Sequence, residues 1–153
     1  MVPLVSPQKF DRCRVQPLSK GLVVDDVRAV RQIVLTVMQN RGLSVLEAND
    51  GFDAWKFLQD ELVDIVFTDI EMPKWNGIDL LRKMRQSSDE RLRTLPVVVL
   101  SSLDRPKLVQ YVSRFENAYF VRKPVSMRQL DIMLGLIETS RWLRLQRLRC
   151  DDD

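Results

Sequence analysis

Five short apolar segments alternate along this chain with segments of helical periodicity, and this alternation constrains the fold more than any other feature. The apolar segments occupy residues 21–25, 44–47, 63–67, 96–100 and 118–121. They are short and mostly continuous in apolar residues, as strands buried on both faces of a sheet are. Strands that alternate with helices predict a parallel sheet covered on both faces, so we expect one α/β domain.

Apolar residues recur every three to four positions between these segments, as they do in amphipathic helices. Val27, Val30, Val34 and Val37 have this spacing in the first of them. We expect helices at about residues 27–41, 52–60, 78–86, 104–115 and 127–149. Residues 87–95 are mostly polar, and we interpret them as a connector.

Charge and composition narrow the classes of function. Residues 1–20 hold four basic and one acidic residue, which leaves 20 of each sign in residues 21–153 and no overall basic surface for direct DNA binding. The chain has no histidine, which excludes Ser-His catalysis and histidine-ligated metals within it. No apolar run approaches the roughly 18–20 residues of a membrane span, and Cys13 and Cys150 have no metal-ligand spacing. We therefore expect a cytoplasmic protein without a membrane segment.

Polar side chains lie where the predicted strands end. Asp25 and Asp26 end the first strand and Asp69 follows the third, while Ser101 ends the fourth and Lys123 follows the fifth. Ligands of open parallel sheets bind at this edge. Three carboxylates repel one another and one lysine does not balance them, so either a carboxylate is protonated or a cation binds. Mg²⁺ suits such a site, and an aspartate beside it can attack phosphorus.

In this order, the motifs make the chain similar to the receiver (CheY-like) domain of response regulators over about residues 20–140. The acidic pair within residues 22–26, the stretch at 69–77, Ser101 and the segment at 120–124 carry the resemblance. It implies a flavodoxin-like, doubly wound (βα)5 domain with a five-stranded parallel sheet in the order 2-1-3-4-5.

Two further segments flank this expected domain. We expect residues 1–19 to form a flexible N-terminal tail, because prolines recur there without a clear period. Residues 141–153 are expected to hold a basic extension of the last helix and an acidic tail.

The resemblance implies a role for each acidic residue of the site. Asp69 would accept a phosphoryl group. Asp26 would bind Mg²⁺ (or Mn²⁺) directly, and Asp25 would assist through water. The backbone carbonyl of Glu71 would supply a further metal ligand. Phosphoryl transfer would then depend on this cation.

The resemblance also implies how the phosphorylated state would be sensed. Lys123 and Ser101 would bind the phosphoryl oxygens, and the rotation of Phe120 would report the movement of Ser101 to the surface. The peptide bond between Lys123 and Pro124 would be cis, as X-Pro bonds allow. The partner face would combine the last two predicted helices with the last predicted strand.

A signalling switch of this kind is not an enzyme acting on an external substrate. A sensor histidine kinase or a histidine phosphotransfer protein would donate the phosphoryl group, and a downstream effector protein would receive the signal. A homodimer through the partner face or through the C-terminal helix is a further expectation.

Two other functions remain open. A degenerate receiver would bind partners without phosphorylation. An aspartyl-phosphate phosphatase usually has a second aspartate two residues after its nucleophile, where this chain has Glu71. The chain also departs from many receivers at residues 116–119, where a Gly-Ala-Asp-like turn is frequent, and at Leu103, which is often polar in the family.

The segment at 141–149 combines arginines with large apolar residues. Its members are Arg141, Trp142, Leu143, Arg144, Leu145, Arg147, Leu148 and Arg149. The segment is interpreted either as a solvated helix extension or as a docking or dimerisation helix, since exposed apolar residues mark partner sites.

Overall fold

The computed structural model describes residues 17–102 and 105–150. Most of the expected N-terminal tail, Leu103 and the acidic tail at 151–153 lie outside the described residues. The strands are β1 (Lys20–Val24), β2 (Ser44–Ala48), β3 (Ile65–Asp69), β4 (Val97–Ser101) and β5 (Ala118–Arg122). The helices are α1 (Arg28–Asn40), α2 (Gly51–Asp60), α3 (Gly77–Arg85), α4 (Glu90–Thr94), α5 (Pro106–Ser113) and α6 (Met127–Cys150).

The five strands form one parallel sheet in the order β2-β1-β3-β4-β5. This order confirms the flavodoxin-like arrangement that the sequence predicts. The chain steps outward from β1 to β2 and then crosses to β3 on the other side of β1. Such a reversal leaves a crevice at the carboxyl ends of β1 and β3, where ligands of this fold class bind.

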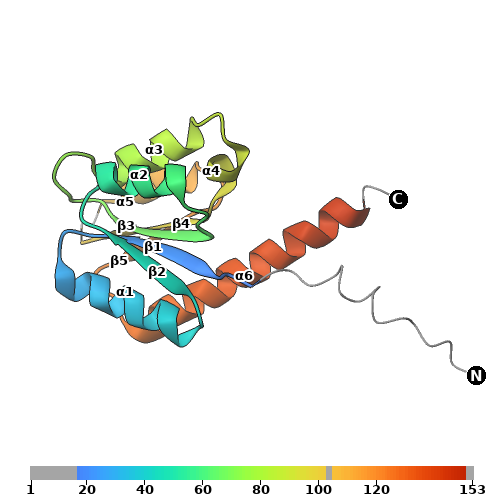
Figure 1. Ribbon diagram of the computed structural model, residues 1–153, viewed down its shortest axis with the longest axis horizontal. Helices are drawn as coiled ribbons and strands as arrows, with labels where there is room; N and C mark the ends of the chain where they lie inside the picture. Colours follow the sequence, from blue (N-terminus) through green and yellow to red (C-terminus); the bar gives the residue numbers. More distant parts are fainter. Residues whose placement is uncertain (1–16, 103–104, 151–153) are drawn as a thin grey trace, which may run out of the picture.

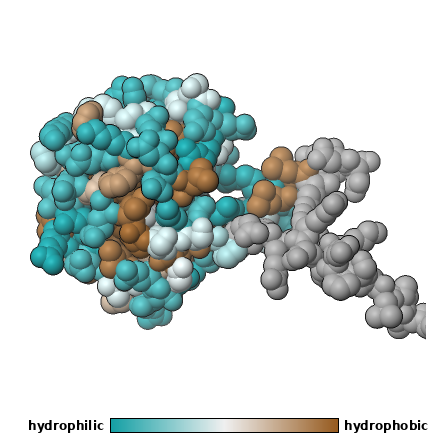
Figure 2. Space-filling view, in the orientation of Figure 1, coloured by the Kyte–Doolittle hydropathy of each residue, from teal (hydrophilic) through white to brown (hydrophobic). Residues whose placement is uncertain are grey.

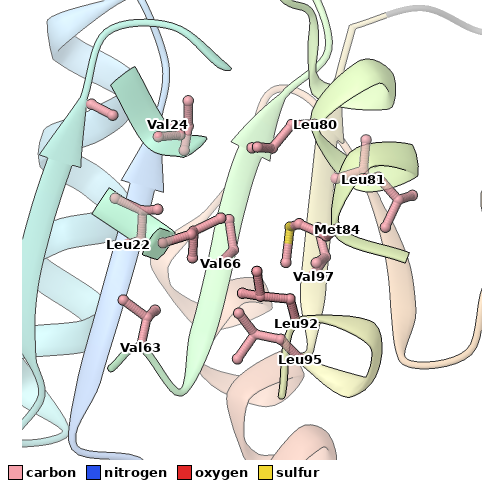
Figure 3. Packing of buried hydrophobic residues seen from close by; sticks show 14 of the residues in the cluster. Leu22, Val24, Val63, Val66, Leu80, Leu81, Met84, Leu92, Leu95 and Val97 are labelled. Atoms are coloured by element: carbon pink, nitrogen blue, oxygen red, sulfur yellow. The ribbon is translucent and has the colours of Figure 1, made fainter. Parts of the chain in front are cut away.

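Helices cover both faces of the sheet, as Figure 1 shows. On one face α2, α3, α4 and α5 pack on strand residues such as Leu22 and Val24, and on the other α1 and α6 pack on strand residues such as Val23. Figure 3 shows part of the first core, where Val66 and Val97 pack with Met84 of α3. Burial on both faces explains why the strands are nearly continuous in apolar residues.

The interpretation of residues 87–95 as a connector is wrong, because Glu90–Thr94 forms the short helix α4. The side chain of Asp89 caps this helix by accepting a hydrogen bond from the Arg91 backbone N–H, and Leu92 is buried beneath it. A single buried leucine gives too little periodicity to reveal a helix of this length in the sequence. The expected fourth and fifth helices are therefore α5 and α6 in the structure.

The described helices include none that is long and apolar enough to cross a membrane. Helix α6 is the longest of them, with 24 residues. Its first half packs on the sheet through Leu130, Leu134 and Ile137, and its second half projects from the domain (Figure 1).

Candidate functional site

The carboxyl ends of four strands bring the predicted site residues together. Asp69 is the last residue of β3 and Ser101 is the last residue of β4, while Asp25 follows β1 directly and Lys123 follows β5. Asp25, Asp69 and Ser101 have exposed fractions of only 1%, 4% and 0%. Parallel strands end at the same edge of a sheet, so residues up to 98 positions apart meet here.

Lys123 connects two of the three carboxylates. Its Nζ lies 3.1 Å from Asp25 Oδ2 and 3.1 Å from Asp69 Oδ1. Asp26, which is exposed, completes the acidic cluster, because one carboxylate oxygen from each of the three aspartates lies within 4.8 Å of the others. Three carboxylates thus face one ammonium group, as the sequence predicts.

Asp25 is held in place through its backbone and its side chain. Its N–H donates to the carbonyl of Ala48 on β2 at 3.2 Å, and its Oδ1 accepts from the N–H of Val27 at 2.8 Å. Its carbonyl accepts from Arg31 Nη1 at 2.6 Å, which ties α1 to the end of β1. These contacts leave Oδ2 of Asp25 directed at Lys123.

The loop that follows Asp69 turns back tightly toward the strand. The N–H of Gly77 donates to the carbonyl of Ile70 at 3.1 Å, and a Cβ on Gly77 would collide with the carbonyl oxygen of Asp69. Within the loop Lys74 has φ of 62°, and its Nζ lies 3.4 Å from Asp50 Oδ2. Glycine at position 77 is therefore a steric requirement of the path that the loop takes.

The charges of the site shift two pKa values. Burial raises the pKa of Asp69, the Lys123 ammonium opposes this shift, and the charge of Asp25 reinforces it. Burial lowers the pKa of Lys123, but the contacts with Asp69 and Asp25 outweigh it, so that the net shift of this pKa is upward. The lysine is thus held as a cation, while the ionised form of Asp69 is disfavoured in the absence of a further cation.

The donor set of this site fits a hard divalent cation. All three side chains offer oxygen ligands, and Lys123 neutralises only part of their charge. Mg²⁺ takes octahedral oxygen coordination and commonly uses one or two carboxylates together with water and phosphate oxygens. The exposed position of Asp26 keeps one side of the cluster open to solvent.

The remaining predicted residues lie around this cluster. Ser101 accepts a backbone hydrogen bond of 2.8 Å from the Lys123 N–H through its carbonyl oxygen. Glu71 lies exposed two residues beyond Asp69. Phe120 is half-buried on β5, paired with Val99 two residues before Ser101. The peptide bond between Lys123 and Pro124 is cis, as expected.

Sequence reasoning missed three polar residues next to the site. Arg31 binds the Asp25 carbonyl, the buried Thr68 donates to the carbonyl of Asp69 at 3.0 Å, and Asp50 caps α2 while pairing with Lys74. The sequence gives a signal only for Asp50, which precedes a glycine at the start of a helical segment and so resembles an N-cap. For Arg31 and Thr68 the contact depends on the tertiary arrangement.

The comparison with protein-family models gives the same class as the fold and the site. The model of the response regulator receiver domain matches residues 22–134. Chemotaxis protein CheY1 of Helicobacter pylori is 31% identical over 122 residues, which are 76% of this chain and 97% of that protein. The chain therefore belongs to the response regulator receiver domain family, and hence to two-component phosphorelay signalling.

Solved structures and longer relatives agree with this family. The structure of the chemotaxis response regulator CheY4 of Vibrio cholerae matches with a TM-score of 0.70 and 26% identity, over 78% of this chain and 98% of that chain. The CAI-1 autoinducer sensor kinase/phosphatase CqsS of Vibrio cholerae is 30% identical over 80% of this chain, but the match spans 18% of CqsS. This chain spans only about a fifth to a third of the length of several curated relatives that it matches.

Proposed function

We propose that this receiver domain is a phosphorylation-dependent switch and that Asp69 accepts the phosphoryl group. The observation that carries the proposal is the Lys123 ammonium, which lies 3.1 Å from an oxygen of Asp69 while Asp25 holds it from the other side. An ammonium in this position neutralises charge on a phosphoryl group that reaches Asp69. Competing uses of Asp69, such as capping a turn, do not account for a half-buried lysine in contact with two aspartates.

The acidic cluster is proposed to hold Mg²⁺ (or Mn²⁺). Asp26 and Asp69 would be direct ligands, Asp25 would assist through water, and the backbone carbonyl of Glu71 would complete the protein's share. When bound, the cation supplies positive charge that screens the carboxylates and the phosphoryl oxygens from one another. Two observations support this assignment: the cluster offers carboxylate oxygens as ligands, and Lys123 neutralises only part of its negative charge.

The proposed transfer proceeds by attack of an Asp69 carboxylate oxygen on the phosphorus of a phosphohistidine. The O–P bond to Asp69 forms, the P–N bond of the donor breaks, and its electron pair stays on the imidazole nitrogen. The chain contains no histidine, so the donor is proposed to be a sensor histidine kinase or a histidine phosphotransfer protein. A sensor kinase/phosphatase among the relatives supports this class of partner. Later attack by water releases inorganic phosphate and restores the carboxylate.

Signalling is proposed to follow from contacts that the phosphoryl group gains at Ser101 and Lys123. These contacts would favour one of two pre-existing conformations, and Phe120 on β5 would report the change at the face formed by α5, β5 and α6. A downstream effector protein would bind this face. A homodimer through this face or through the C-terminal part of α6 is also proposed.

The division of the chain is part of the proposal. Residues 20–140 would act as the receiver domain, preceded by a tail at 1–19 and followed by the helix extension and acidic tail at 141–153. We propose a regulatory phosphoacceptor in the cytoplasm without turnover of an external substrate. One relative, a protein-glutamate methylesterase of Rhodopseudomonas palustris, is matched over 33% of its length, so a receiver of this kind also occurs within an enzyme.

Intact-protein mass spectrometry tests the acceptor and the metal together. The protein is incubated with phosphoramidate in the presence or absence of Mg²⁺, and wild type is compared with Asp69→Asn. One phosphoryl adduct is expected in wild type with Mg²⁺ only. Asp60→Asn, which changes an exposed aspartate at the end of α2, is the matched control and should behave as wild type.

A missing adduct is resolved by titration with fluoroberyllate, read by tryptophan fluorescence. Saturable binding that Asp69→Asn abolishes would support Asp69 as the acceptor and would mean that phosphoramidate is a poor donor for this protein. No binding would contradict the switch and favour the degenerate receiver. Release of phosphate from an external phosphomonoester would instead favour the phosphatase.

A further inference from the structure

The loop that joins Asp69 to α3 is closed at its base. The N–H of Gly77 donates to the carbonyl of Ile70 at 3.1 Å, so the two ends of the loop are bonded to each other. The N–H of Ile70 in turn donates to the carbonyl of Leu100 on β4 at 3.2 Å. These bonds fix where the loop begins and ends, but the path of residues 71–76 between them depends on other contacts.

The start of α2 supplies contacts to the top of this loop. The N–H of Gly51 donates to the carbonyl of Trp75 at 3.2 Å. The ring of Phe52 meets the Trp75 ring edge-on, with 5.8 Å between the two centroids. The Nζ of Lys74 lies 3.4 Å from Oδ2 of Asp50, the cap residue of α2. A backbone hydrogen bond, an aromatic contact and an ion pair thus join three successive residues to the loop.

Asp50 is withdrawn from solvent at this junction. The surface that carries α2 is largely hydrophilic (Figure 2), yet only 7% of the Asp50 side chain is exposed. Its Oδ1 accepts from the Asp53 N–H at 2.9 Å, which leaves Oδ2 for Lys74. The Asp53 N–H lowers the pKa of Asp50, burial opposes this shift and Lys74 reinforces it. The carboxylate therefore caps α2 with one oxygen and holds the loop with the other.

Two features of the backbone indicate that these contacts determine the path of the loop. Lys74 has φ of 62°, a conformation that a residue other than glycine keeps only where its surroundings hold it. A Cβ on Gly51 would lie 2.7 Å from the carbonyl oxygen of Trp75. Glycine at position 51 thus allows the helix to approach the loop backbone closely enough to bond to it.

The same junction also contacts the acidic end of β1. The carbonyl of Ala48 accepts from the Asp25 N–H at 3.2 Å, so residues 48–51 contact both acidic segments of the site. Within the loop, the backbone of Glu71 interacts with the Asp69 carboxylate. A shift of the loop against this junction would therefore move the Glu71 carbonyl relative to the aspartates.

We propose that Asp50 is a positioning residue of the cation site. Together with Gly51, it holds the loop in the path that presents the Glu71 carbonyl to Mg²⁺. The inference rests on the proposed function, because it requires that the acidic cluster binds this cation. Groups that orient metal ligands without touching the metal are commonly needed for full affinity. The loss of Asp50 should therefore weaken Mg²⁺ binding although no ligand is removed.

Isothermal titration calorimetry of the full chain with Mg²⁺ alone tests this role. Gly51→Ala should raise the dissociation constant by about tenfold, because the added methyl group displaces the Trp75 carbonyl. Asp50→Asn, which can still cap α2, should raise it by about threefold, and Lys74→Met by the same factor. Asp50→Asn combined with Lys74→Met should bind no more weakly than either variant alone, because both break one contact. Circular dichroism verifies that each variant is folded.

The direction of the Lys74→Met effect separates positioning from simple charge. If Lys74 acted on Mg²⁺ only through its charge, removing this charge would tighten binding. Lys56→Met is the matched control, because it removes the same charge from an exposed residue of α2 that packs on the Phe52 ring. Its dissociation constant should stay within about twofold of wild type. Lys74→Arg keeps the ion pair with Asp50 and should also bind as wild type does.

A Lys74→Met variant that binds Mg²⁺ as tightly as wild type, or more tightly, would overturn the inference. A folded Gly51→Ala variant with the dissociation constant of wild type would overturn it as well. Both results would leave the cation site in place. Wild type that binds no Mg²⁺ would instead overturn the cation site itself, and this inference with it.

Discussion

The two edges of the sheet use charged residues in opposite ways. At the carboxyl edge, three aspartates face the single ammonium of Lys123. At the amino edge, Arg85 of α3 directs its guanidinium at backbone carbonyls, with hydrogen bonds of 3.0 Å to Leu92, 2.8 Å to Leu95 and 2.8 Å to Glu116. Negative charge at the carboxyl edge thus exceeds the positive charge beside it, whereas the positive charge of Arg85 at the amino edge is matched by backbone carbonyls that accept its hydrogen bonds.

This difference indicates that the carboxyl edge is suited to binding ligands, whereas the charged contacts of the amino edge stabilise the fold. Carboxylates that lack enough cations leave free energy to be gained by an arriving cation. A guanidinium whose donors are satisfied by carbonyls gains little from a ligand, and it stabilises the fold instead. Substitutions should therefore lower stability at the amino edge without changing phosphorylation, whereas at the carboxyl edge they should change metal binding and phosphorylation with little loss of stability.

Arg85→Ala should have the largest effect on stability. Burial lowers the pKa of Arg85 to about 10, which reflects how far its guanidinium is withdrawn from water. Removing it leaves the carbonyls of Leu92, Leu95 and Glu116 without this donor and frees α4 from α3. We expect a loss of about 3 kcal/mol in the free energy of unfolding, measured by urea denaturation.

Arg85→Lys is the control for this substitution. An ammonium group cannot reproduce a planar fork that spans three carbonyls, so lysine should recover less than half of the loss. The fraction of folded Arg85→Ala that accepts a phosphoryl group should equal that of wild type. Unequal phosphorylation at equal folding would show that the amino edge also takes part in the chemistry.

Asn117→Ala should have the second largest effect, with a loss of about 2 kcal/mol in the free energy of unfolding. Asn117 has φ of 58°, its Nδ2 donates to the carbonyl of Thr94 at 2.8 Å, and its Oδ1 accepts from Arg144. Asn117→Gly keeps the backbone conformation but removes both side-chain contacts, so it should lose about half as much. Urea denaturation of the two variants separates strain from contacts. Equal losses would mean that backbone strain contributes nothing.

The fold follows largely from patterns that the sequence displays. Continuous apolar strands and periodic helices predict the parallel sheet, and its order follows from the resemblance to receivers. Helix α4 is not predictable because it is short and is held by hydrogen bonds from the Arg85 side chain to backbone carbonyls, which leave no periodic pattern in the sequence. The start of β3 was predicted two residues early, at Val63, because Val63 is buried without belonging to the strand.

The site was predictable because parallel strands place their ends together, whatever lies between them in the sequence. Asp25, Asp69 and Lys123 each follow or end a strand, so connectivity alone brings them to one edge. The contact of Arg31 with the Asp25 carbonyl depends on how α1 packs, and side-chain spacing does not encode it. The roles of Ser101, Glu71 and Phe120 stay predictions, since they concern states with a bound cation or phosphoryl group.

Mg²⁺ should stabilise the wild-type protein by less than the loss expected for Asn117→Ala and by more than the gain expected for Asp69→Asn. A cation that binds only the folded state at ten times its dissociation constant adds about 1.4 kcal/mol to the free energy of unfolding. Asp26→Asn should abolish this increment, and because Asp26 is exposed, it should alter stability without Mg²⁺ by less than about 0.5 kcal/mol. Thermal unfolding with and without Mg²⁺ measures both quantities. An unchanged increment in the variant would exclude Asp26 as a ligand.

Asp69→Asn should have the smallest effect, and it should be stabilising. The pKa of Asp69 in the folded protein is raised above its ordinary value of 3.8, chiefly by burial. A carboxyl group with a raised folded-state pKa contributes to stability below the unfolded pKa and loses that contribution as the pH rises through the folded pKa. Ionised Asp69 therefore destabilises the cation-free protein at pH 7, and asparagine removes this penalty.

The gain from Asp69→Asn should be under about 1 kcal/mol at pH 7 and should shrink as the pH falls through the folded-state pKa and below 3.8, where the wild-type carboxyl group becomes protonated in both states. Urea denaturation across this pH range, without divalent cations, measures it. Saturating Mg²⁺ should reverse the order of the two proteins, because wild type retains the carboxylate that the cation neutralises and the variant does not. If asparagine instead destabilises the protein at pH 7 without Mg²⁺, Asp69 is already balanced by Lys123, and the contrast between the two edges of the sheet does not hold.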